Sequence, residues 1–266
     1  MTVARLNGIT LSYETVGSGE LVVLVMGTGS PGRVWSVHQV PALVAAGYRV
    51  ATFDNRGIPP TDECADGMTI ADLVGDTAAL IEHLGAPARV VGTSLGSRIV
   101  QELSLARPEL VTHAVSLAAY ARLDTPQKML NSGQKALYDS GTVLPPAYHA
   151  AVSALQNLSP ATLSDQATAQ DWLEIFELSG SAIGAGARAQ LDLADAVDRR
   201  SAYRAITVPT LVVGFADDAT IPARLSREVA DVIPGARYEE IPDTGHLGYL
   251  ERPAEVNRVV LDFLAT

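Results

Sequence analysis

Ser94 lies at the centre of Gly92-Thr93-Ser94-Leu95-Gly96, a G-x-S-x-G pentapeptide between an apolar segment typical of a strand and a helical pattern. Such a strand-turn-helix setting holds a serine in strained backbone geometry and projects its hydroxyl outward, and the flanking glycines leave room for neighbouring backbone. The amide of Leu95 begins the helix, where unpaired N–H groups favour negative charge. The pattern predicts Ser94 as a nucleophile in acyl transfer and Leu95 as an oxyanion donor.

A serine hydroxyl is a weak nucleophile at neutral pH, so acyl transfer needs a histidine as general base and a carboxylate that orients this histidine. His246 is favoured because the loop 243–248 contains glycines and directly follows the last expected strand, where an α/β sheet presents reactive groups. Structural or surface positions are expected for the other histidines, which lie in or beside expected helices and strands or in the middle of the chain: His38, His83, His113 and His149.

Two adjacent aspartates, Asp217 and Asp218, lie in the loop 214–222, which also follows an expected strand. From the residues alone, either carboxylate could face the histidine. The histidines form no cluster with the spacing of metal ligands, so the sequence predicts no metal site and no other cofactor.

Short apolar segments alternate with helical patterns in residues 1–120 and 205–266. Because parallel strands are joined by crossover helices, this alternation predicts a mostly parallel sheet covered by helices. The expected strands are residues 9–16, 21–26, 48–53, 89–92, 111–118, 208–214 and 237–241. The expected helices are residues 35–46, 70–84 with Thr69 as cap and Gly85 as stop, 95–106 and 253–264.

Residues 121–204 interrupt this alternation, since they contain no convincing strand and several alanine-rich helical patterns, including 148–158 and 171–178. A stretch of this length is not a simple loop, so we expect a helical cap inserted into a core of residues 1–120 and 205–266. Its large apolar residues are candidates for the wall of an apolar pocket, with packing inside the cap as the alternative for each: Trp172, Phe176, Tyr138, Tyr148 and Leu178.

Taken together, these motifs resemble the α/β-hydrolase superfamily, near bacterial esterases and cofactor-free haloperoxidases. The matching residues are Met26-Gly27-Thr28-Gly29, Asp54-Asn55-Arg56-Gly57, Ser94, Asp218 and His246, in the family's order of Ser, Asp and His. The resemblance extends over nearly the whole chain and implies an eight-stranded sheet flanked by helices. In such enzymes the acid precedes a proline by four residues, which selects Asp218 before Pro222, with Asp217 as runner-up and Asp124 as third choice.

The resemblance also implies roles for the segment after the third strand. The amide of Thr28 corresponds to the second oxyanion donor of the family. Met26 stands where the family has a histidine, which changes the pocket wall that Met26, Gly27 and Leu247 are expected to form. For Asp54-Asn55-Arg56-Gly57, a structural role in tying loops together is favoured over a chemical one.

The function predicted from these residues is that of a carboxylic ester hydrolase. Ser94 would form an acyl-enzyme with an ester, lactone or thioester of a small apolar or ring-bearing molecule. The same residues leave open perhydrolysis, carbon–carbon bond hydrolysis, or a biosynthetic cyclisation or isomerisation, and the fold alone also allows a non-catalytic receptor. Epoxide and haloalkane hydrolases are disfavoured, because their elbow carries a carboxylate where Ser94 stands.

Composition limits the partners of the chain. Its 266 residues carry a net charge of −11, which disfavours nucleic acid as a partner. Cys64 is the only cysteine, so no intrachain disulfide is expected. We recognise neither a signal peptide nor an apolar run of the ~18 residues that a membrane span needs, and therefore expect a cytoplasmic protein without membrane contact. The sequence allows a homo-oligomer without indicating one.

Overall fold

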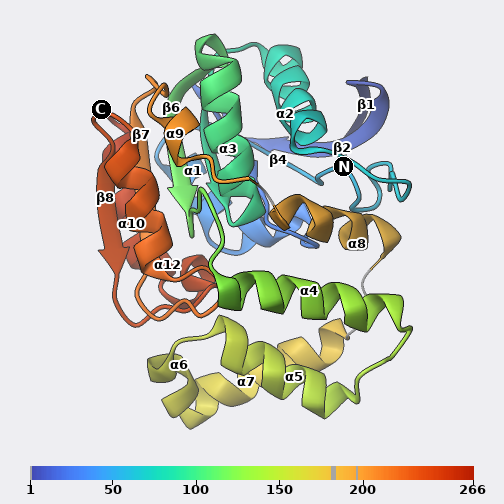
Figure 1. Ribbon diagram of the computed structural model, residues 1–266. Coiled ribbons are helices and arrows are strands. Elements are labelled where there is room, and N and C mark those ends of the chain that lie inside the picture. The colour runs from blue at the N-terminus through green and yellow to red at the C-terminus, as the bar shows by residue number, and fades with distance from the viewer. Residues whose placement is uncertain (1, 181–183, 196) are drawn as a thin grey trace.

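The computed structural model describes residues 2–180, 184–195 and 197–266. Its strands are β1 (Thr2–Leu6), β2 (Ile9–Val16), β3 (Leu21–Val25), β4 (Arg49–Phe53), β5 (Ala88–Thr93), β6 (Val111–Leu117), β7 (Thr210–Phe215) and β8 (Arg237–Ile241). They form one sheet in the order β1-β2-β4-β3-β5-β6-β7-β8 (Figure 1). The pairs β1–β2 and β2–β4 are antiparallel and the other neighbours are parallel, which confirms the predicted eight-stranded, mostly parallel sheet.

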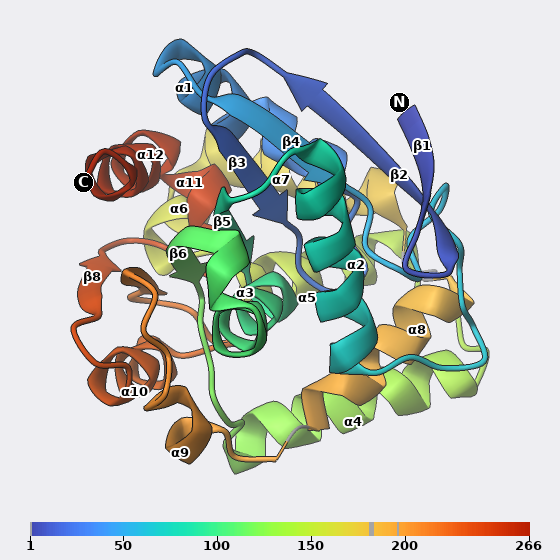
Figure 2. The same ribbon diagram turned by 90° about the horizontal axis from the view of Figure 1, so that it is seen from above.

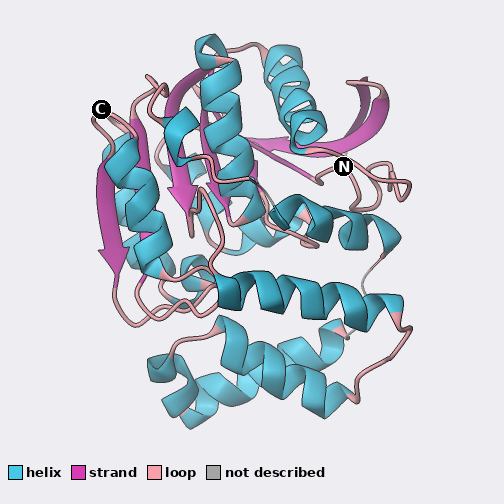
Figure 3. Ribbon diagram, in the orientation of Figure 1, coloured by secondary structure: helices cyan, strands magenta, loops and turns pink. Residues whose placement is uncertain are grey.

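Helices precede or follow most strands, and the central strands lie between helices (Figure 3). The α-helices are α1 (Gln39–Ala45), α2 (Ile70–Leu84), α3 (Leu95–Ala106), α4 (Thr125–Asp139), α5 (Pro146–Asn157), α6 (Pro160–Ser164), α7 (Gln166–Ser179), α8 (Ala185–Leu191), α9 (Arg200–Tyr203), α10 (Ala223–Val232), α11 (Gly248–Glu251) and α12 (Pro253–Leu264). The 3₁₀ helices are η1 (Gly32–Val37), η2 (Pro108–Leu110) and η3 (Asp192–Asp195).

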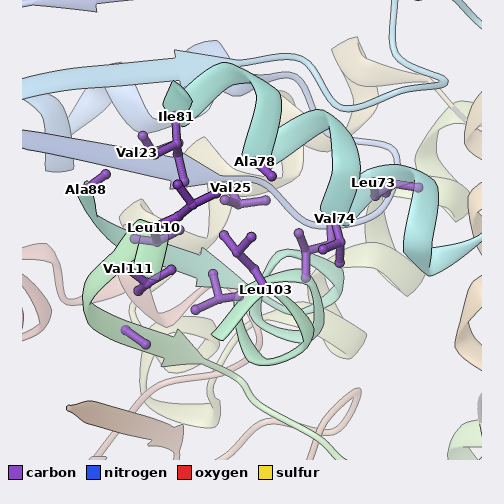
Figure 4. Packing of buried hydrophobic residues seen from close by; sticks show 14 of the residues in the cluster. Val23, Val25, Leu73, Val74, Ala78, Ile81, Ala88, Leu103, Leu110 and Val111 are labelled. Atoms are coloured by element: carbon purple, nitrogen blue, oxygen red, sulfur yellow. The ribbon is translucent and has the colours of Figure 1, made fainter. Parts of the chain in front are cut away.

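Both faces of the sheet are covered. Helices α2, α3 and α10 lie on one face, and α1 and α12 lie on the other (Figure 2). In β3, Val23 and Val25 join the apolar cluster beneath α2 and α3 (Figure 4), whereas Val22 and Leu24 join the cluster beneath α1 and α12. This double burial explains the unbroken apolar run of β3, because successive side chains of a strand point to opposite faces.

The helix expected over residues 35–46 is not continuous, and this prediction is corrected here. The chain forms η1 first, and α1 begins only after His38, whose φ of −135° lies outside the helical region. Pro41 gives a physical reason, because proline has no backbone N–H and is tolerated only in the first turn of a helix. A restart at Gln39 places Pro41 in that first turn.

The insertion of residues 121–204 is helical throughout its described elements and divides into two parts. Helices α4 to α7 lie beyond the end of the sheet to which the parallel strands point (Figure 1). Helices α8 and α9 return to the core. A Cβ atom on Gly186 would lie 2.3 Å from the carbonyl oxygen of Gly57, and Tyr203 is fully buried in the cluster beneath α2 and α3.

Candidate active site

Ser94 lies in the turn between β5 and α3, with φ 53° and ψ −117°. An L-residue rarely adopts a positive φ, so the turn is strained. A Cβ on Gly92 would lie 2.3 Å from the carbonyl oxygen of Gly96, and a Cβ on Gly96 would lie 2.1 Å from that of Val25. Neither position has room for a side chain, which is the physical reason for both glycines of the pentapeptide.

Hydrogen bonds hold this turn in place. The Ser94 amide donates to the carbonyl oxygen of Leu117 at 3.0 Å, and the Ser97 hydroxyl donates to the carbonyl oxygen of Ser94 at 2.7 Å. The loop after β3 passes close by, because a Cβ on Gly27 would lie 3.9 Å from Ser94 Oγ. Gly27 therefore borders the hydroxyl, and the amide of Leu95 begins α3 beside it.

His246 and Asp218 are joined directly. His246 Nδ1 lies 2.7 Å from Asp218 Oδ2, and Asp218 Oδ1 accepts the amides of Thr220 at 2.8 Å and Ile221 at 2.7 Å. The Asp218 side chain is fully buried, so these partners replace the water that the carboxylate gives up. A carboxylate only accepts, so Nδ1 carries the proton and Nε2 is the nitrogen that can take up another.

The other two aspartates considered for this role have different surroundings. Asp217 is exposed, and its amide donates to the carbonyl oxygen of Thr244 at 2.8 Å. Asp124 forms ion pairs with Arg122 and Arg224. Of the three, Asp218 is the carboxylate that the structure places against His246.

Ser94, Asp218 and His246 follow β5, β7 and β8, so all three lie at the carboxyl edge of the sheet. Between the described side chains of Ser94 and His246 no hydrogen bond forms in this structure. Such bonds are often long in the absence of substrate and tighten only in the complex. The structure thus brings together the histidine and the aspartate, and places the serine at the same edge of the sheet without a hydrogen bond to the imidazole.

The loop after β3, which contains Thr28, is held on one side by the segment after β4. Asn55 Nδ2 donates to the carbonyl oxygen of Met26 at 2.8 Å, and Asp54 Oδ1 accepts the Gly32 amide at 2.8 Å. Burial raises the pKa of Asp54. Arg56 pairs with the buried Asp76 at 2.7 Å. Asp54, Asn55 and Arg56 thus tie loops together, as the sequence suggested.

Gln190 holds the same loop from the other side, and sequence reasoning missed it. Its Oε1 accepts the Gly29 amide at 2.9 Å, and its Nε2 donates to the carbonyl oxygen of Arg56 at 2.7 Å. Gln190 is fully buried in α8. It therefore fixes the backbone immediately after Thr28, and no motif marks it in the sequence.

The predicted pocket residues divide by exposure. Met26 is buried, and the Tyr249 hydroxyl donates to its sulfur at 3.8 Å, while burial raises the pKa of Tyr249 and keeps this hydroxyl protonated. Trp172 and Phe176 stack on each other in α7, with ring centroids 5.7 Å apart. Leu178 is 88% exposed, so it is not enclosed in a pocket wall, and that expectation is wrong.

Tyr148 is likewise exposed at 59%, and its expected place in the pocket wall is also corrected. In both helices some exposed positions carry apolar side chains, so hydrophobicity alone did not distinguish enclosed residues from surface residues. Tyr138 and Leu247 are half-buried, and Leu247 packs against the cluster beneath α1 and α12.

Within the described ranges there is neither a metal-ligand cluster nor a helix that could span a membrane. No three His, Cys, Asp or Glu side chains of these residues are grouped so that they could hold a metal ion. No helix formed by the described part of the chain has the length and apolarity needed to cross a bilayer.

Comparison with known proteins places these features in context. A family model described as the Alpha/beta hydrolase family matches residues 22–259. A Mycobacterium tuberculosis protein named as a candidate non-heme bromoperoxidase, BpoC, is 50% identical over 259 residues, covering 97% of this chain and 98% of the relative. A candidate carbamate hydrolase, RutD, of Variovorax paradoxus is 31% identical over 260 residues, covering 96% of each chain.

Solved structures of similar proteins also match this chain over nearly its whole length. The crystal structure of BpoC from M. tuberculosis H37Rv matches with a TM-score of 0.93 at 50% identity, covering 96% of this chain and 95% of that one. The crystal structure of an enol-lactonase from Burkholderia xenovorans LB400 matches with a TM-score of 0.84 at 25% identity, covering 100% of each chain. Both matches extend over the helical insertion as well as the sheet.

Proposed function

The chain belongs to the alpha/beta hydrolase family, and from this membership we propose that it cleaves esters, lactones or thioesters through an acyl-enzyme on Ser94. The observation that carries the proposal is the buried Asp218–His246 pair, joined at 2.7 Å, at the same edge of the sheet as the strained Ser94. Hydrolysis of carboxylic esters is the activity that these groups support best.

In the proposed reaction, His246 Nε2 takes the proton of Ser94 Oγ while this oxygen attacks the substrate carbonyl. Asp218 stabilises the imidazolium that forms. The amides of Leu95 and Thr28 donate to the oxyanion, and one such donor is typically worth ~3 kcal/mol in the transition state. The imidazolium then protonates the leaving alcohol or thiol, and water activated by His246 releases the acid from Ser94.

The substrate class that we propose is a small apolar or ring-bearing acyl compound. The names of the relatives support a carbonyl that bears a heteroatom leaving group, since one is an enol-lactonase and another a candidate carbamate hydrolase. The stacked Trp172 and Phe176 in the cap offer aromatic surface for a ring.

Perhydrolysis is a second candidate, favoured by the 50% identity to a protein named as a candidate non-heme bromoperoxidase. In this reaction hydrogen peroxide replaces water in the second half of the cycle. It attacks the acyl-enzyme carbonyl, the ester bond to Ser94 Oγ breaks, and a peracid leaves while the proton returns to Ser94. The same residues serve both reactions, because only the attacking oxygen differs.

The nucleophile is tested with a fluorophosphonate probe, which reacts with activated serines. We expect wild type and Ser201→Ala to be labelled and Ser94→Ala to stay unlabelled. Ser201 is an exposed serine of α9 and supplies the matched control. Persistent labelling of Ser94→Ala would show that another residue is the nucleophile.

The reaction is tested with a panel of aryl esters, lactones and thioesters, with and without hydrogen peroxide. Release of free acid that depends on Ser94 supports hydrolysis. Peracid formed faster than free acid in peroxide would favour the second candidate. If a panel compound binds tightly but Ser94 does not turn it over, the result would favour a non-catalytic receptor instead.

A further inference from the structure

The end of α5 in the cap contacts the loops of both Asp218 and His246. Gln156 Nε2 donates to Thr220 Oγ1 at 3.4 Å, and the amide of Thr220 donates to Asp218 Oδ1 at 2.8 Å. Asn157 accepts the amide of Leu247 on its carbonyl oxygen at 3.1 Å. One short segment of the cap therefore touches the surroundings of both members of the pair.

Glu251, at the end of α11, joins the same segment to the histidine loop. Its Oε2 accepts the amide of Gly245 at 2.6 Å, and its Oε1 accepts the amide of Ser159 at 2.8 Å. Ser159 is fully buried between α5 and α6, and Gly245 immediately precedes His246. Both hydrogen bonds are made to a charged acceptor, which makes them stronger than bonds between neutral groups.

Gly245 has no side chain, so its backbone packs directly against the backbone of Asn157 at the end of α5. A Cβ at this position would lie 2.4 Å from the carbonyl oxygen of Asn157. The cap backbone therefore packs on the backbone of the residue before His246. A shift of the cap at this point must move the histidine loop or break the two bonds to Glu251.

We propose that Glu251 is a positioning residue, which sets the alignment of His246 toward Ser94 through the seating of the cap. The inference rests on the proposed hydrolase function. Its physical basis is that Asp218 holds the imidazole only at Nδ1, at 2.7 Å. No hydrogen bond between the described Ser94 and His246 side chains fixes the Nε2 edge, so the backbone of the histidine loop also sets where this edge lies. Glu251 touches neither of these side chains and acts through Gly245 and Ser159.

The first test removes one acceptor oxygen. Glu251→Gln keeps the size of the side chain, but its amide nitrogen cannot accept, so one of the two bonds is lost. We expect kcat for an aryl acetate to fall about ten- to hundredfold, because small misplacements of a reacting group have effects of this size. KM should change less than about threefold, as for a loss confined to the transition state. Glu255→Gln, an exposed site in α12, is the matched control and should keep wild-type kinetics.

A second pair of variants acts on the cap side. Ser159 has φ −70°, which proline also adopts, so Ser159→Pro removes the N–H that Glu251 accepts. Ser159→Ala removes the same hydroxyl cap of α6 but keeps the N–H. We expect the proline variant to show the lowered kcat of Glu251→Gln and the alanine variant to stay within about threefold of wild type. If Glu251→Gln does not fold, the comparison of the two Ser159 variants tests the positioning role instead.

Two measurements separate positioning from stability. The first is kcat per active molecule, where complete labelling by a fluorophosphonate gives the concentration of active protein. The second is the melting temperature of each variant. A lower melting temperature with unchanged kcat per labelled molecule would overturn the positioning role. A wild type that neither labels nor turns over the ester panel would instead refute the proposed hydrolase, and the positioning role with it.

Discussion

At the scale of single residues, both carboxylate oxygens of Asp218 are engaged. Oδ2 faces His246 Nδ1 at 2.7 Å, and Oδ1 accepts the amide of Ile221 at 2.7 Å. An ionised carboxylate cannot donate, so it keeps the imidazole proton on Nδ1 and leaves Nε2 free to accept the proton in the proposed reaction. An asparagine at this position has the same shape but can donate, which favours the wrong tautomer.

We therefore expect Asp218→Asn to lower kcat for an aryl ester by about 10⁴-fold, the size of effect that a wrong tautomer produces in a serine triad. The exposed Asp217 is the matched control, and Asp217→Asn should change kcat less than about threefold. Steady-state kinetics of the two purified variants, with circular dichroism to compare their folding, measure the difference. A larger loss in Asp217→Asn would assign the orienting role to that residue.

Part of this site was predictable because its signals are local. The glycines around Ser94 and the loop of His246 are visible in a few consecutive residues. Gln190 and Glu251 were not, because they accept backbone amides that are 161 and 92 residues away in the chain, and a backbone amide leaves no mark on the sequence.

At the scale of elements, helices with both ends marked by sequence were predicted with their bounds. Helix α2 begins at Thr69, where a capping box with Asp72 is formed, and ends at Gly85 with φ 95°. Helix α3 ends before Arg107, which precedes a proline. The break between η1 and α1 was missed, because the apolar pattern continues across His38 and only Pro41 signals that a helix must restart.

His113, in β6, is expected to make the stability of the protein depend on pH. Burial lowers the pKa of His113, the nearby Arg89 lowers it further, and Glu20 opposes both. The Nδ1 atom is buried without a hydrogen-bond partner among the described residues, and the ring meets Phe263 edge-on at 5.5 Å. The folded state therefore disfavours the charged imidazole.

Since the pKa in the folded protein lies below the ordinary value of about 6.5, the unfolded chain binds more protons just below that pH. His113 should thus lower the free energy of unfolding as pH falls below about 6.5, and this loss is absent above it. We expect His113→Phe, which keeps an aromatic contact with Phe263, to lose less stability than wild type between pH 7 and 5. Urea denaturation at several pH values measures both slopes, and equal slopes would exclude His113 as a contributor.

At the scale of the whole molecule, the core and the outer cap differ in how deeply they are packed. Every residue of β3 is buried, whereas α7 has no fully buried residue and α5 buries only Ala150 and Ala154. Helices α5 and α7 pack mainly on each other. Their described hydrogen bonds to the core gather at the end of α5, around residues 156–159. Helices α5 and α7 are therefore less deeply packed than the sheet, and their described hydrogen bonds to the core are made at this joint.

Hydrogen exchange tests this difference, and α3 supplies a helix as the matched control. Nine of the twelve residues of α3 are buried, and none of the fourteen of α7. Local opening costs less where fewer apolar contacts are broken, so the amides of α7 should exchange through openings of lower free energy than those of α3. The amides at 157–159, held at the joint, should be better protected than the middle of α7. Equal protection in α3 and α7 would mean that cap and core open as one unit.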